Sequence, residues 1–89
     1  PGIDLAVVAA ILSSTLDLPL DPNTALCGEV GLTGEVRPVA RVEQRMMEAA
    51  KLGMKRIVVS GLVSKGPKPP KGLELVRVNR VGELQKVLF

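Results

Sequence analysis

Residues 28–39, which read GEVGLTGEVRPV, decide the fold of this 89-residue chain. Their apolar residues are spaced as in two strands that meet at a tight turn at Thr33-Gly34. Glycine supplies the positive φ that such a turn requires, and Pro38 can end the second strand because it has no N–H for the ladder. We therefore predict a β-hairpin with strands over residues 24–32 and 35–39.

The residues after this hairpin predict a helix followed by a buried strand. Over residues 41–52 the apolar positions repeat at i, i+4, i+7 and i+8 from Val42, which places them on one face of a helix. Gly53 is the residue expected just beyond the helix end. The β-branched run at 56–60 is typical of a central strand.

Both ends of the chain also predict helices. Residues 4–15 predict a helix that Asp4 can cap, and residues 5–12 are apolar on every side of it, which suits a helix covered by other elements. A further strand is expected over 73–78, and Asn79 can cap a closing helix over 80–88. The order helix, two strands, helix, strand, loop, strand, helix favours an α/β fold, an α+β two-layer arrangement in a single domain over residues 1–89.

Composition excludes several kinds of site. Cys27 is the single cysteine and there is no histidine, which rules out a Cys/His zinc site and a histidine-based catalytic triad. The longest apolar run, residues 5–12, is shorter than the roughly 18 residues that cross a bilayer, so we expect no membrane partner. A net charge of +3 permits an anionic partner without requiring one. Because the chain opens on Pro-Gly without a Met, we expect it to be a piece of a longer protein whose C-terminus is Phe89.

A family resemblance rests on GEVGLTGEVRP and on the following ARVEQRMMEAAKLGMKRIVVSG. These residues resemble the C-terminal part of the Lon-protease-like domain, most closely the version in the RadA (Sms) family of bacterial DNA-repair ATPases. The resemblance implies a ribosomal protein S5 domain 2-like fold of the Lon proteolytic type. In that fold further strands precede the first helix, so the chain looks like the C-terminal half of the domain with the N-terminal strands missing.

The same resemblance predicts that the peptidase chemistry is absent. Lon peptidases use a serine in a Gly-Pro-Ser-Ala-Gly motif, and aligning its proline with Pro1 puts Gly2 at the serine position. Their lysine lies in a Gly-Gly-Leu-Lys-Glu-Lys stretch, and counting from Pro38 puts Glu43 at the lysine position. The chemistry needs a hydroxyl and an amine within hydrogen-bond reach, so we predict no catalytic residue in this chain.

Positive charge is the remaining candidate for a functional site. Arg41 and Arg45 lie along the predicted second helix, and Lys65, Lys68 and Lys71 are spaced by three in a Pro- and Gly-rich loop. Such cations can follow a phosphate backbone without reading its sequence, although a solvated loop and an ordinary charged helix face explain each cluster as well. We predict that these five residues bind DNA.

The resemblance also implies a parent protein and its partners. That parent carries an N-terminal zinc finger and a RecA-like ATPase that drives branch migration on DNA. ATP and zinc then belong to the parent, and we expect no cofactor in this chain. The implied partners are DNA, further copies in a hexameric ring, and a recombinase filament. The implied compartment is the bacterial cytoplasm, or an organelle for a plant homologue.

Two other functions fit parts of the sequence. The first is the proteolytic domain of an ATP-dependent Lon-type peptidase, which the missing Ser–Lys pair argues against. The second is the Lon-like domain of a ComM-type AAA+ protein, which a P-loop after the domain would favour.

Overall fold

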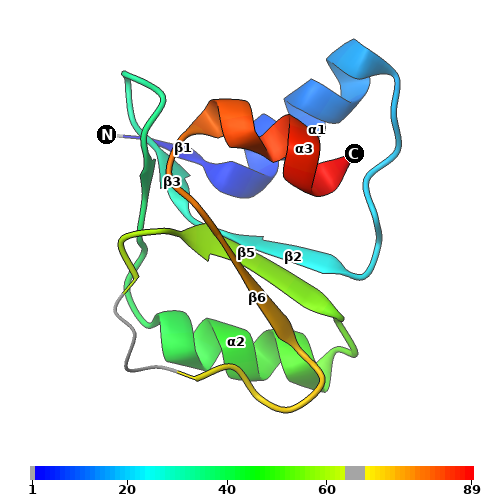
Figure 1. Cartoon of the computed structure of the whole chain (residues 1–89), viewed down its shortest axis with the longest axis vertical. Coiled ribbons are helices and arrows are strands. Elements are labelled where there is room, and N and C mark those ends of the chain that lie inside the picture. Colours follow the sequence, from blue (N-terminus) through cyan, green and yellow to red (C-terminus); the bar gives the residue numbers. More distant parts are fainter. Residues whose placement is uncertain (1, 64–67) are drawn as a thin grey trace.

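A computed structural model describes residues 2–63 and 68–89 of the chain (Figure 1). The elements follow one another along the chain as β1 (Ile3–Asp4), α1 (Leu5–Leu16), β2 (Thr24–Cys27), β3 (Glu29–Val30), β4 (Val36–Arg37), α2 (Val42–Lys51), β5 (Arg56–Ser60), β6 (Glu74–Val78), the 3-10 turn η1 (Val81–Glu83) and α3 (Leu84–Leu88).

The larger sheet is parallel and has the order β2-β5-β6. Side chains alternate along β5, so that Val58 faces one side of the sheet while Ile57 and Val59 face the other. Helices α1 and α3 cover the side of Val58, and α2 covers the opposite side (Figure 1). Helices packed in layers on a sheet confirm the predicted α/β class.

These two sides hold separate apolar clusters. The buried members under α1 and α3 are Leu5, Ala9, Val30, Val36, Val58, Val78, Leu84 and Leu88. The buried members under α2 are Cys27, Met46, Ala49, Ile57, Val59, Val63 and Leu73. Each helix is therefore fixed by the face that it turns to the sheet.

The first helix is confirmed, with the predicted cap. The Asp4 carboxylate accepts a hydrogen bond from the N–H of Ala6 at 2.8 Å, which satisfies one of the free donors of the first turn. The helix ends where Asp17 turns left-handed, with a φ of 55°. Leu5 is fully buried, whereas Ile11 stays 59% exposed.

The predicted strand over residues 24–32 is wrong, because the chain changes sheets at Gly28. Residues before it form β2 of the parallel sheet, and residues after it form β3, which pairs with β1 and β4 in a small antiparallel sheet. The N–H of Leu5 donates to the Gly28 carbonyl at 2.9 Å. At this break, Gly28 therefore bonds to the start of α1 where a strand would bond to a neighbouring strand. The hairpin is confirmed only over β3 and β4, with Gly34 at a φ of 85° in the turn.

In the second half of the chain, the helix and strands lie close to where the sequence predicts them. Helix α2 ends at Lys51, and Gly53 takes the expected left-handed conformation after it, with a φ of 82°. The predicted cap at Asn79 is wrong, because the N-cap is Arg80. The Glu83 carboxylate accepts the N–H groups of both Asn79 and Arg80 at 2.9 Å, so the closing helix begins as the 3-10 turn η1.

Candidate nucleic-acid interface

Helix α2 presents two of the predicted cations to solvent. Met46 and Ala49 point to the sheet and are 1% and 5% exposed, while Arg41 and Arg45 are exposed. The two arginines are one turn apart, and the N–H of Arg45 donates to the carbonyl of Arg41 at 3.1 Å. The structure therefore brings together this part of the predicted set.

Arg41, the residue just before α2, has a left-handed backbone conformation, with φ 60° and ψ 42°. Side chains other than glycine, asparagine and aspartate rarely adopt this conformation, which costs about 1–2 kcal/mol. Arg41 makes no side-chain hydrogen bond to cap the helix. Its long cationic side chain is thus held at an unfavourable backbone position without helping to start the helix.

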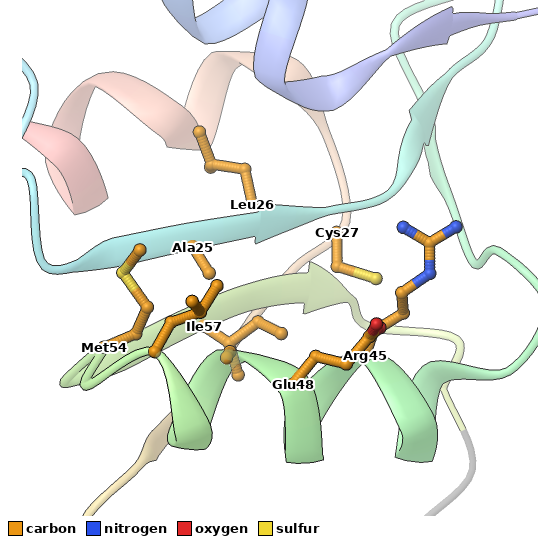
Figure 2. Close-up of a pocket in the computed structure, with 9 residues that line it drawn as sticks. Ala25, Leu26, Cys27, Arg45, Glu48, Met54 and Ile57 are labelled. Carbon is orange, nitrogen blue, oxygen red and sulfur yellow. The ribbon is translucent and has the colours of Figure 1, made fainter.

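Arg45 also borders a pocket between α2 and the outer edge of β2. Figure 2 shows Arg45 and Glu48 on α2 near Cys27 of β2, and the apolar side chains of Ala25 and Ile57 line the same pocket to the left. Burial raises the pKa of the Cys27 thiol, and the positive charge of Arg45 acts in the opposite direction. The thiol is therefore protonated at neutral pH, which makes Cys27 a small core residue rather than a nucleophile.

Lys68 and Lys71 belong to the α2 side of the molecule. Both lysines are exposed, and they come shortly before Leu73, which shares an apolar cluster with Met46 of α2. Residues 68–72 therefore lead into the sheet on the side that α2 covers. Lys65 lies outside the described residues.

Three other arginines have structural partners that no pattern in the sequence predicts. The Arg56 guanidinium donates to the Val87 carbonyl through Nη1 and Nη2, each at 3.2 Å, and to the Thr24 hydroxyl through Nε. Arg80 donates to the Thr33 carbonyl, and Arg37 is 4.0 Å from the carboxylate of Glu35. Arg56 and Arg80 thus connect parts of the chain that are far apart in sequence, whereas Arg37 contacts a residue two positions away.

The side chain of Glu29 fills the space beside Gly2, the position predicted for the peptidase serine. A Cβ atom built on Gly2 would come within 2.5 Å of the Cγ and 2.6 Å of the Oε1 of Glu29. This contact was not predicted from the sequence. It depends on the pairing of β1 with β3, in which Asp4 lies opposite Glu29. Glu43, at the lysine position, is exposed in the first turn of α2.

The part of the chain that the structure describes shows neither a cluster of metal ligands nor a membrane-spanning helix. Residues 2–63 and 68–89 contain no group of three or more His, Cys, Asp or Glu side chains that could hold a metal ion. Within the same residues, every helix is too short or too polar to cross a membrane.

Comparisons with known proteins place the chain among characterised sequences. A sequence model of the family described as subunit ChlI of Mg-chelatase matches residues 1–61. The DNA repair protein RadA of Bacillus subtilis (strain 168) is 52% identical over 83 residues, which cover 93% of this chain and 18% of that relative. The DNA repair protein RadA of Streptococcus pyogenes serotype M6 is 47% identical over 89 residues, which cover 100% of this chain and 20% of that relative. The chain thus spans about a fifth of the length of the curated relatives it matches.

Proposed function

This chain belongs to the ChlI-type family and corresponds to one segment of a RadA-type DNA repair protein, and we propose that the segment is a non-peptidase Lon-like domain that binds DNA and supports self-assembly. The observation that carries the proposal is the exposure of Arg41, Arg45, Lys68 and Lys71 on the α2 side, in a chain related to DNA repair proteins. The relatives named RadA, at 46–52% identity, do not favour a Lon-type peptidase or a ComM-type protein.

DNA binding would come from charge rather than from base reading. Arg41 and Arg45 are exposed at the start and along the first turn of α2, and Lys68 and Lys71 are exposed shortly before Leu73 on the same side of the sheet, where these cations can meet phosphates. The chain contains one aromatic residue, Phe89, so stacking on bases has almost no basis here. We therefore expect sequence-independent binding that weakens steeply as salt rises.

The absence of peptidase activity is supported at both positions of the Ser–Lys pair. A lysine base needs a lowered pKa, which comes from burial, whereas the residue at that position is the exposed carboxylate of Glu43. At the other position Gly2 carries no hydroxyl, and Glu29 occupies the space that a side chain would need. We expect the parent protein to leave unfolded casein intact in the presence of ATP, and Gly2→Ser to leave it intact as well.

The parent protein supplies the remaining chemistry in this proposal. The chain has no G-x-x-x-x-G-K-[ST] segment for phosphates, and its one cysteine and lack of histidine do not suit a zinc finger. ATP and zinc are therefore assigned to other segments of a parent that acts as a DNA-dependent ATPase in branch migration. Its proposed partners are DNA, further copies in a hexameric ring and a recombinase filament, in the bacterial cytoplasm.

The salt dependence of DNA binding by the full-length protein tests the proposal. Arg41→Ala and Arg45→Ala should each lower the affinity, and each should reduce the slope of log K against log salt by about 0.9 for one lost phosphate contact on duplex DNA. Lys86→Ala is the matched control, because it removes an exposed cation from α3 on the opposite side of the sheet. Equal slopes for the Arg45 and Lys86 variants would contradict the assignment of the α2 side.

A further inference from the structure

Three exposed lysines gather where helix α2 ends. Lys51 is the last residue of α2, and Lys55 comes four residues later, just before β5. Lys71 approaches the same place from the other side, because it lies three residues before Glu74, whose N–H donates to the carbonyl of Lys55 at 2.9 Å. All three lysines are exposed, and Figure 1 shows the yellow segment before β6 beside this end of α2. This end therefore carries a second group of cations, apart from the arginines at the start of the helix.

Helix α2 separates these two groups of cations. Its ten residues rise about 15 Å from the arginine end to the lysine end. Between Arg45 and Lys51 the one charged residue is Glu48, which is exposed. Each end also has one exposed carboxylate, Glu43 near the arginines and Glu74 near the lysines, and each end keeps an excess of positive charge. The helix is therefore cationic at both ends and anionic in its middle.

This charge pattern suits a groove of duplex DNA better than a single strand. A single strand that follows the helix places phosphates along all of it, and the exposed carboxylate of Glu48 repels those over the middle. The two strands of a duplex hold their phosphates on either side of a groove, and the major groove is about 12 Å wide. When α2 lies across this groove, phosphates meet its two cationic ends and none lies over its middle.

We infer that α2 lies across the major groove of duplex DNA, with the arginines at its start on the phosphates of one strand and Lys51 and Lys55 on those of the other. The inference rests on the proposed DNA binding and names the kind of DNA that the site takes. Lys71 adds to the second group. Because the contacts go to phosphates, the base sequence has little influence on affinity. We therefore expect the protein to bind duplex DNA more tightly than either of its separated strands.

Fluorescence anisotropy of the full-length protein, with a labelled duplex of mixed sequence and with one of its strands alone, tests this arrangement. The double variant Lys51→Ala with Lys55→Ala should lower the affinity for the duplex about tenfold and reduce the slope of log K against log salt by about 1.8, since two phosphate contacts are lost. The affinity for the single strand should change by less than about twofold, because that strand keeps its contacts with the arginines. Lys86→Ala on α3 is the control and should leave both affinities unchanged.

The anionic middle of α2 provides an independent test. Glu48→Lys replaces the repelling carboxylate by a cation, so a single strand that follows the helix gains a phosphate contact there. The affinity for the single strand should rise several-fold, whereas the affinity for the duplex should stay the same because no phosphate lies over the groove. Gln85→Lys, which adds a cation at an exposed position of α3, controls for the added positive charge.

The outcomes separate this inference from the proposal that it rests on. Unchanged duplex affinity in the double lysine variant, together with a loss in Arg45→Ala, would overturn the groove arrangement and leave DNA binding by the α2 side standing. Equal losses for duplex and single strand would overturn the groove arrangement in favour of one strand along the helix, as would equal gains with Glu48→Lys. No loss in either the lysine variant or Arg45→Ala would overturn both.

Discussion

Arg41 adopts a backbone conformation that glycine adopts without steric cost, and it does so at the edge of the proposed DNA surface. Residues held in such conformations cluster at functional sites, where a side chain is needed despite the strain. Arg41→Gly should therefore keep or raise the free energy of unfolding, by up to about 1 kcal/mol, because relief of strain outweighs the entropy that glycine costs. The same variant should lose DNA affinity.

Denaturant unfolding and DNA titration of Arg41→Gly and Arg41→Ala test this expectation. Both variants should bind DNA equally weakly, and the glycine variant should be the more stable of the two. DNA affinity that is unchanged in Arg41→Gly would show that the left-handed arginine serves the turn alone.

We expect the free energy of unfolding to depend on pH through a second residue, Glu35. The Thr33 hydroxyl donates to its carboxylate at 2.8 Å and holds the pKa of Glu35 below its ordinary value of 4.5. Because the pKa is lower in the folded state, the stabilisation is present above pH 4.5 and is lost as the pH falls through the folded value. Glu35→Gln should be less stable than the unchanged chain at neutral pH and equal to it in acid.

Denaturant titrations at neutral and acid pH measure this difference. Glu74→Gln, which removes an exposed carboxylate outside the turn, serves as the control. A gap between Glu35→Gln and the unchanged chain that stays constant with pH would refute the role of the Thr33 hydrogen bond.

Arg56 fastens elements that are far apart in the chain. Its guanidinium joins the start of β5 to the carbonyl of Val87 in α3 and to Thr24 at the start of β2. Arg56→Met should lower the free energy of unfolding by about 1–3 kcal/mol, because the Val87 carbonyl loses its donors. DNA affinity should stay unchanged, which is the reverse of the result expected for Arg45→Ala. Lys55→Ala, at the exposed neighbouring position, should alter stability little.

At the scale of elements, local signals predicted the helices better than the strands. Periodicity and end residues located α1 and α2 to within a residue or two, because Asp4 and Gly53 act on their own neighbours. The break at Gly28 could not be read from the sequence, since β2 takes its partner from β5. The candidate cations were found from charge alone, whereas the roles of Arg56 and Glu29 depend on backbone and side-chain positions that leave no pattern in the sequence.

As a whole, the molecule is as compact as a chain of its length that folds alone. The radius of gyration is 12.3 Å, against about 12 Å expected for a folded domain of this size. We therefore expect the isolated chain to unfold in one cooperative transition, although the resemblance treats it as half of a domain. Leu84→Ala, at a fully buried position, should lower the free energy of unfolding by about 2–5 kcal/mol.

Circular dichroism suits this measurement, because the chain has neither Trp nor Tyr for fluorescence. Leu32→Ala is the control, at a leucine that is 93% exposed. A broad transition without a shared midpoint for helix and sheet signals would show that the chain needs further strands to complete its core.

The parallel pairing of β2 with β5 has a consequence for the order of events during synthesis. Thr24 of β2 lies 32 residues before its partner Arg56, and parallel strands cannot form by closing a short turn. On the ribosome, the backbone of β2 therefore stays unpaired until β5 has emerged. β6 emerges after β5 and completes the sheet last. Distant pairing of this kind slows folding, so the nascent chain passes through a period in which the apolar residues of α1 have no sheet to cover them.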